Sequence, residues 1–207
     1  TTVTWSAHHT DLSADGTLYD PEGGLDDLAC GRLRFIGDTE ARIKEDYLRI
    51  LRYFRFSAHS QFSAGIKAGA EHVRADMRVI EKDALNLANV SKERLWSECL
   101  AWFQRGDIMP SLRLAAKAGV LDAVFSSPAP TGSAEPPPGA PWPTLKALQA
   151  YEFLCHALAR APEPLMRLLC LFIEDVAGRY RLVRTLQNWP LSRSERRTLK
   201  ALENALA

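Results

Sequence analysis

The residues with the clearest chemical potential lie between positions 42 and 55, where acids and arginines alternate with apolar residues. Asp46 and Arg49 are three positions apart, so on a helix both side chains would project from one face. A carboxylate can accept from the exocyclic amino group of a base, and a guanidinium can donate to a neighbouring ring acceptor. The same spacing also fits an exposed Asp–Arg ion pair that contributes little to stability.

Four further charged residues could support this pair, namely Arg42, Glu45, Arg52 and Arg55. Arg52 and Arg55 could hold a nucleotide or an RNA end, or they could brace Glu45 and the surrounding helices. We favour bracing. Phe54 lies on the apolar stripe of the same segment, so we expect it in the core rather than stacked on a base.

Gly23 and Gly24 form a second feature with functional potential. Paired glycines after an extended segment let the backbone turn sharply or flex, which is the chemistry of a hinge. Such pairs are common in plain loops, so the pair alone favours a plain loop over a hinge.

Most of the chain has helical periodicity, which predicts a mainly α-helical fold with a small β remnant at the N-terminus. Residues 12–21 fit two short extended segments around an Asp-Gly turn, a helical turn could follow at Leu25–Ala29, and Arg32–Ile36 alternates like a strand. From Glu40 to Ala58 the apolar positions form one stripe, which predicts one helix. Further helices are expected at the following places: His72–Asn86; after Ser91; from Pro110 to a stop at Gly119; over two apolar stripes at 147–158 and 165–176; and after a capping box at Ser192–Glu195.

Composition divides the rest of the chain and excludes several classes of protein. Residues 126–143 hold seven of the twelve prolines, which predicts a flexible linker or a long surface loop. The longest apolar run, Leu168–Ile173, is too short to span a bilayer, so no membrane partner is expected. The four cysteines form no C-x-x-C pair, which argues against zinc and favours a reduced, cytoplasmic compartment.

The net charge of +1 conceals a basic C-terminal region. From Val176 to the end, seven basic residues face two acids, and such a region could follow a phosphate backbone. A helical surface of mixed charge would look similar. The candidate RNA-backbone contacts are Arg179, Arg181, Arg184, Arg193, Arg196 and Arg197.

Taken together, the motifs resemble those of class II tRNA nucleotidyltransferases, in the CCA-adding enzyme and poly(A) polymerase superfamily. The resemblance covers roughly residues 12–125 and is highly specific as a set. It rests on Asp20–Leu28, which follows D-x-x-G-G-x-x-D-L; on Arg32–Asp38; on Glu45–Phe56, which follows E-D-x-L-R-x-L-R-[FY]-x-R-F; and on Val90–Glu98 and Ser111–Leu121.

The resemblance implies both an organisation and a role. Residues 1–38 would be a remnant of the catalytic head and its hinge at Gly23 and Gly24, residues 39–125 a helical neck, and residues 144–207 a helical body or tail. Asp46 and Arg49 would read the Watson–Crick edge of CTP or ATP. The parent enzyme would use Mg²⁺ to add CCA to tRNA 3′ ends.

Two departures from the family pattern concern catalysis. The chain has no Gly-Ser-x-Asp-x-Asp arrangement for the metal ions, and Thr4–Asp11 stands where the family carries Arg-Arg-Asp-Phe-Thr. Asp38-Thr39-Glu40 has suitable acid spacing but matches a family loop with no metal role, so we reject it. We therefore assign no catalytic or metal-binding residue and expect this chain alone to be inactive.

The sequence is compatible with several functional hypotheses. The chain could work with a separate head domain, belong to a poly(A) polymerase-like protein, act as a headless RNA-binding protein, or survive only as a structural remnant. The expected partners are tRNA or another RNA, together with CTP and ATP. The sequence does not indicate an oligomeric state.

Overall fold

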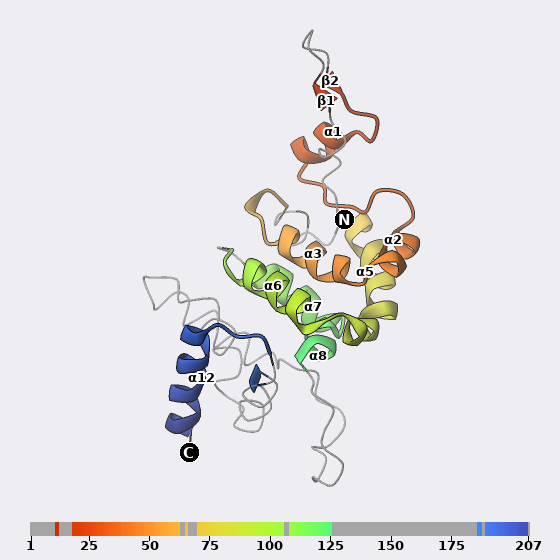
Figure 1. The fold of residues 1–207 in the computed structure, drawn as a ribbon. Helices are drawn as coiled ribbons and strands as arrows, with labels where there is room; N and C mark the ends of the chain where they lie inside the picture. Colours follow the sequence, from red (N-terminus) through yellow and green to blue (C-terminus); the bar gives the residue numbers. More distant parts are fainter. Residues whose placement is uncertain are drawn as a thin grey trace.

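The computed structural model describes residues 11–12, 18–62, 65, 70–105, 108–125, 186–187 and 189–206, and this part of the chain is mainly α-helical, as predicted. A small hairpin and α1 lie at one end of the molecule, the packed helices form its middle, and the C-terminal helix lies toward the other end (Figure 1). The elements are β1 (Asp11–Leu12), β2 (Leu18–Tyr19), α1 (Gly24–Ala29), α2 (Thr39–Glu45), α3 (Leu48–Ser57), α5 (Glu71–Asp83), the 3-10 helix η2 (Ala84–Asn89), α6 (Lys92–Phe103), α7 (Met109–Lys117), α8 (Val120–Phe125) and α12 (Arg193–Leu206).

The N-terminal hairpin matches the two short extended segments expected from the sequence. Strands β1 and β2 pair antiparallel, with Asp11 opposite Tyr19 and Leu12 opposite Leu18. The expected strand at Arg32–Ile36 is wrong, because this stretch joins no sheet in the described part of the chain. Its alternation has another cause: Leu33 and Phe35 are buried in the helical core, while Arg34 between them pairs with Asp27 of α1.

The α1 segment is fixed by its polar and backbone contacts. Gly23 adopts a left-handed φ of 68°, and the Asp20 carboxylate accepts from the backbone N–H groups of Gly24 and Leu25 at 2.8 and 2.9 Å. Gly31, just after α1, also has a positive φ, and a Cβ there would lie 2.4 Å from the Gln61 carbonyl oxygen. The α1 end therefore lies directly against the chain that follows α3.

The stripe from Glu40 to Ala58 belongs to two helices rather than the one helix predicted. The backbone of Asp46 is extended, with φ −157° and ψ 102°, so α2 ends before it and α3 begins after Tyr47. The Asp46 Oδ1 accepts from the Leu48 N–H at 3.2 Å, which gives that N–H a partner outside a continuous helix. Ile43 and Ile50 are both fully buried on either side of the break, so the periodicity continues although the helix does not.

The core is built where α3 packs across α6 and α7. Phe54 is fully buried, as predicted, and stacks on Trp102 of α6 with ring centroids 5.7 Å apart. Tyr53 is equally buried and stacks on Phe35 at 5.5 Å. Neither ring is available to stack on a base.

The other helices predicted between residues 70 and 125 are present in the described part of the chain, with altered ends. The helix expected at His72–Asn86 is α5, which continues as η2. Ser91 precedes α6 without a side-chain capping bond, and Pro110 lies in the first turn of α7. Gly119, with φ 68°, separates α7 from α8 as expected.

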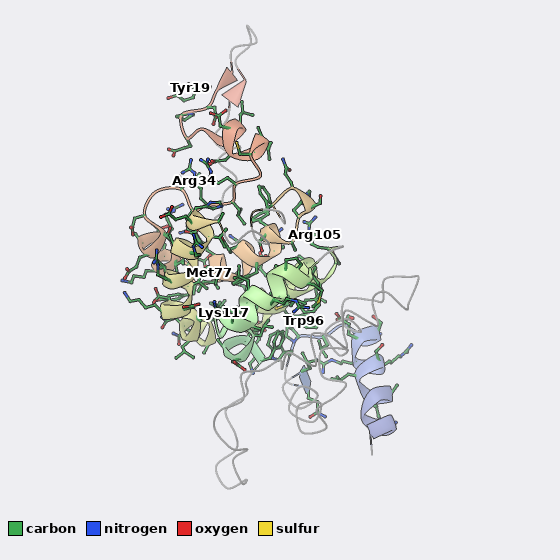
Figure 2. All side chains as sticks on the ribbon, turned by 180° about the vertical axis from the view of Figure 1, so that it is seen from behind. Tyr19, Arg34, Met77, Trp96, Arg105 and Lys117 are labelled. Atoms are coloured by element: carbon green, nitrogen blue, oxygen red, sulfur yellow. The ribbon has the colours of Figure 1, made fainter. Side chains whose placement is uncertain are left out.

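The C-terminal part of the described chain is anchored to the helices by aromatic contacts. Trp189 stacks on Phe125 at 5.7 Å and meets Trp96 edge to face at 5.5 Å; Figure 2 labels Trp96 on the side of the helices that faces this segment. The predicted capping box opens α12: the Ser192 N–H donates to Glu195 Oε2 at 2.7 Å, and the Glu195 N–H donates to Ser192 Oγ at 3.3 Å.

Within the described ranges, no helix is long and apolar enough to cross a bilayer. The predicted linker at 126–143 and the stripes at 147–158 and 165–176 lie outside the described residues. The domain boundaries stay predictions.

Candidate functional site

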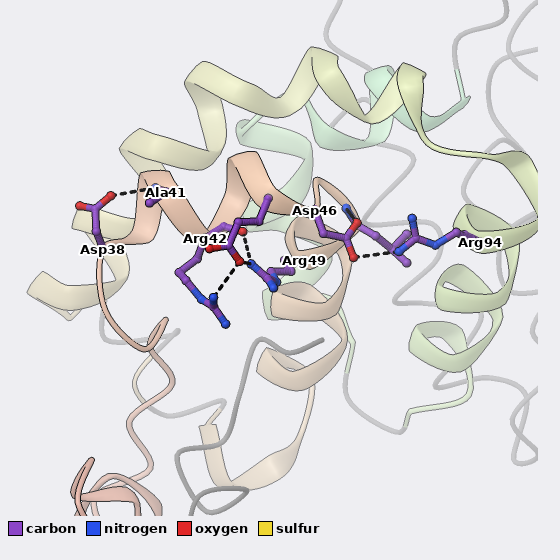
Figure 3. Close-up of polar contacts among 8 residues, drawn as sticks. Asp38, Ala41, Arg42, Asp46, Arg49 and Arg94 are labelled. Atoms are coloured by element: carbon purple, nitrogen blue, oxygen red, sulfur yellow. Dashed lines mark hydrogen bonds and ion pairs between the residues drawn. The ribbon is translucent and has the colours of Figure 1, made fainter.

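The carboxylate of Asp46 lies at the junction between α2 and α3 and is held through both of its oxygens. Oδ1 accepts from the Leu48 N–H at 3.2 Å, and Oδ2 accepts from Nη2 of Arg94 on α6 at 2.8 Å (Figure 3). The Asp46 side chain is only 18% exposed, whereas that of Arg94 is half exposed. Arg94 thus joins the α2–α3 junction to a helix 48 residues further along the chain.

Arg49, in the first turn of α3, is held on the other side of the same junction. Its Nη1 donates to Glu45 Oε2 at 2.6 Å and to the carbonyl oxygen of Arg42 (Figure 3). Its side chain is buried, and Nε is a buried donor with no partner among the described residues. A buried guanidinium N–H without a partner carries an energetic cost.

The expectation that Asp46 and Arg49 share one helical face is wrong, because the helix breaks at Asp46. The two residues remain neighbours through the backbone, since the Arg49 N–H donates to the Asp46 carbonyl oxygen at 3.0 Å. Each charge is paired with a different partner: Asp46 with Arg94, and Arg49 with Glu45. Their base-reading roles stay a prediction.

Glu45 is the shared acceptor of this site. Its Oε2 accepts hydrogen bonds from Arg49 at 2.6 Å and from Arg42 at 2.7 Å. Hydrogen bonding from Arg49, with a further contribution from Arg42, holds the pKa of the Glu45 carboxyl below its usual value. A carboxylate between two guanidiniums orients both, so Glu45 and Arg42 support Arg49 from the end of α2.

Arg52 and Arg55 meet a carboxylate other than the one expected. Their Nε atoms donate to Oε1 and Oε2 of Glu98 on α6, at 3.0 and 2.8 Å, so the acid they hold is Glu98 rather than Glu45. The Arg55 guanidinium also lies over the ring of Phe56, 4.3 Å from its centroid. In this structure the two arginines tie α3 to α6.

Sequence reasoning did not single out Arg94 or Glu98 as site residues. Both belong to Val90–Glu98, a stretch that the motif comparison had matched as a whole, and that match was the available signal. Spacing could not have found them, because their partners lie more than 40 residues earlier on other helices.

Asp38 and Glu40 make hydrogen bonds within and around α2. Asp38 caps α2 by accepting from the Ala41 N–H at 2.7 Å (Figure 3), and Glu40 accepts from Lys44 and Lys82 at 2.6 and 2.7 Å. The two lysine hydrogen bonds lower the pKa of Glu40 to about 2. No three His, Cys, Asp or Glu side chains gather to hold a metal ion in the ranges that the structure describes, so these residues do not fit the paired Mg²⁺ ions that the resemblance implies.

The remaining candidates are widely separated. Gly23 and Gly24 lie at the start of α1, with Arg34 between that end of the molecule and the helical middle (Figure 2). Arg193, Arg196 and Arg197 lie on α12, where Arg196 donates to the carbonyl oxygens of Leu191 and Trp189. Arg179, Arg181 and Arg184 lie outside the described residues.

Comparison with known proteins gives matches over part of the chain. Residues 77–130 match the family model described as "Probable RNA and SrmB- binding site of polymerase A". The chain is 44% identical over 87 residues to the "CCA tRNA nucleotidyltransferase 1, mitochondrial" of Danio rerio, covering 42% of this chain and 19% of the relative. It is 30% identical over 159 residues to the "CCA-adding enzyme" of Geobacillus thermodenitrificans (75% and 37%), and 33% identical over 111 residues to "Poly(A) polymerase I" of Haemophilus influenzae (54% and 23%).

Solved structures share the fold. A chain described as "Structure of tRNA-processing enzyme complex 3" superposes with a TM-score of 0.58 at 22% identity, covering 89% of this chain and 47% of that one. An apo form of a tRNA-processing enzyme gives 0.57 at 20% identity, covering 91% and 47%. The chain thus spans less than half the length of these relatives and solved structures.

Proposed function

The chain belongs to the CCA tRNA nucleotidyltransferase/poly(A) polymerase family through its RNA-binding neck and body region, and from that premise we propose that it contributes base selection and tRNA binding to CCA addition. Asp46 and Arg49 select CTP and ATP, supported by Glu45 and Arg42. Residues 77–130 and the basic face of α12 bind the tRNA. Transfer itself takes place in the cytoplasm on metal-binding carboxylates that a head domain supplies.

The observation that carries the base-selection proposal is the placement of two opposite charges, Asp46 and Arg49, at the α2–α3 junction. Asp46 carries an acceptor, and the Arg49 guanidinium carries donors beside the same junction. Cytosine and adenine offer an amino group beside a ring acceptor, which complements that pair. Guanine and uracil place a carbonyl oxygen against the carboxylate, and the repulsion between two acceptors disfavours them.

Calorimetry on the full chain with Mg²⁺ tests this proposal by comparing CTP, ATP, UTP and GTP. We expect CTP and ATP to bind more tightly than the other two, and Asp46→Ala to remove the preference. Each good base contact contributes about 1–3 kcal/mol of discrimination, or roughly fivefold or more in affinity. Glu81→Gln, an exposed change on α5, is the matched control. Equal binding of all four nucleotides would contradict the proposal.

A second candidate is RNA binding without catalysis, as a headless or poly(A) polymerase-like protein. The match of residues 77–130 to an RNA-binding model and the similarity to a bacterial poly(A) polymerase favour it. In either case this chain alone transfers no nucleotide. Incorporation of labelled CMP or AMP into tRNA by the pure chain would overturn that statement, and tRNA binding without any nucleotide preference would favour the second candidate.

A further inference from the structure

The contact between Arg94 and Asp46 is the longest-range tie at the α2–α3 junction. Asp46 follows α2, whereas Arg94 lies near the start of α6, within the stretch matched by the RNA-binding model. Their atoms Nη2 and Oδ2 are 2.8 Å apart. The contact therefore connects the nucleotide-reading position to a separate helix.

Rotation of the Asp46 carboxylate is restricted by one donor on each oxygen. The Leu48 N–H donates to Oδ1, and Arg94 donates to Oδ2. Each carboxylate oxygen can accept a second hydrogen bond. The backbone donor alone, at 3.2 Å, leaves the second oxygen unrestrained. Arg94 supplies the missing constraint and balances the carboxylate charge where the side chain is 18% exposed.

Resting on the base-selection role proposed above, we propose that Arg94 is a positioning residue for specificity: it fixes the orientation of Asp46, so that one free lone pair faces the amino group of cytosine or adenine. A carboxylate held in one orientation meets the carbonyl oxygen of uracil or guanine head-on. A carboxylate that is free to rotate can move its oxygen away from that carbonyl, and the repulsion is then weaker. Arg94 thus acts on the discrimination between bases more than on affinity for the correct base.

Arg49, the second residue proposed to contact the base, is also held in place by neighbouring groups. Arg49 is oriented by Glu45 and by the carbonyl oxygen of Arg42, both from α2. Asp46 has no comparable charged partner on α2 or α3 among the described contacts, so its orientation depends on α6. A shift of α6 relative to the junction would alter base selection without touching the nucleotide.

The test compares CTP and UTP binding to the full chain and its Arg94→Ala and Arg94→Lys variants by calorimetry. We expect Arg94→Ala to lower the CTP-to-UTP affinity ratio by about fivefold to tenfold, mainly through tighter UTP binding, which is the size of one lost base contact. Arg94→Lys keeps a donor and the charge and should keep part of the ratio. Arg78→Ala, an exposed arginine on α5, is the matched control, and thermal unfolding confirms that each variant is folded.

The outcomes separate this inference from the proposal beneath it. If the parent chain prefers CTP and Asp46→Ala abolishes the preference while Arg94→Ala keeps the full ratio, Arg94 is not a positioning residue and base selection stands. Tighter CTP binding by Arg94→Ala also overturns the inference, because Arg94 would then compete with the base. A parent chain without any preference overturns both.

Discussion

At the scale of single residues, Asp76 of α5 is a buried acid with one carboxylate oxygen unsupported by the described residues. Its Oδ1 accepts from the Thr39 hydroxyl at 3.0 Å, but Oδ2 is buried with no partner among the described residues. Burial raises the pKa of its carboxyl to about 6, against the opposing effects of Thr39 and Arg34. The nearby Tyr53 hydroxyl is also buried and unpartnered, and burial together with Asp76 raises its pKa.

The raised pKa of Asp76 predicts a pH dependence of stability. Since the pKa of Asp76 in the folded protein lies above its ordinary value of 3.8, the protonated carboxyl stabilises the fold below about pH 4, and this contribution is lost as the pH rises through about 6. Asp76→Asn keeps an acceptor for Thr39 without the charge. It should raise the free energy of unfolding at pH 7.5 by about 1–3 kcal/mol and remove the dependence between pH 4 and 7.

Urea unfolding at a series of pH values measures this effect. Glu81→Gln, an exposed acid on the same helix, is the control and should leave the profile unchanged. An Asp76→Asn profile that follows the parent's would show that the Asp76 carboxylate is not destabilising.

At the scale of elements, Glu98 fastens α6 to α3 by accepting from Arg52 and Arg55. The Glu98 side chain is 14% exposed and the two arginines about 20%, so water screens these charges only partly. Glu98→Gln leaves two neighbouring cations around a neutral amide. We expect it to lower the free energy of unfolding by about 1–3 kcal/mol, a loss typical of a half-buried charge partner.

Chemical denaturation of Glu98→Gln beside Glu93→Gln, an exposed acid on the same helix, provides the measurement. If both variants unfold at the parent's denaturation midpoint, the prediction is contradicted. The two arginines would then be stabilised as much by hydration as by the Glu98 carboxylate.

The elements that sequence predicted correctly are those with local signals. The capping box at Ser192–Glu195, the left-handed stop at Gly119 and the start near Pro110 each depend on residues within one turn. The break at Asp46 was missed because Ile43 and Ile50 keep helical spacing across it, and because Arg94, the charge that binds the Asp46 carboxylate, lies on α6. Similarly, Leu33 and Phe35 alternate because the helical core buries them, which period alone cannot distinguish from a strand.

For the candidate site, the motif pattern located the right segment but not its geometry. Asp46 and Arg49 do lie together at one junction, yet their partners Arg94 and Glu45 come from different helices. Contacts between helices depend on packing angles that no local spacing encodes. The same reason explains why Glu45 was expected as the partner of Arg52 and Arg55, where the structure has Glu98.

At the scale of the whole molecule, Trp189 attaches the segment before α12 to the helical middle. Its ring lies against Phe125 of α8 and Trp96 of α6 and is almost completely buried. Arg196 reinforces the attachment by donating to the carbonyl oxygens of Leu191 and Trp189 at 3.2 Å.

Trp189→Ala should therefore loosen α12 from the rest of the protein. Removing a buried indole costs about 3–5 kcal/mol where the site cannot collapse. We expect faster hydrogen exchange in Arg193–Leu206, measured by mass spectrometry, with little change in α3 or α6. Lys200→Ala, an exposed change on α12 that leaves the aromatic contact intact, should exchange like the parent. Unchanged exchange of α12 in Trp189→Ala would show that other contacts hold the helix.

The break between α2 and α3 also has a consequence for the electric field of the backbone. Peptide dipoles leave partial negative charge at the end of α2 and partial positive charge at the start of α3. Arg49 donates to the α2 carbonyl of Arg42, and Asp46 accepts from the first N–H of α3, so each side chain meets the backbone end of opposite sign. A continuous helix would have no such ends here. Replacing Asp46 with a strong helix former would therefore remove a carboxylate and also tend to erase the local polarity that holds Arg49.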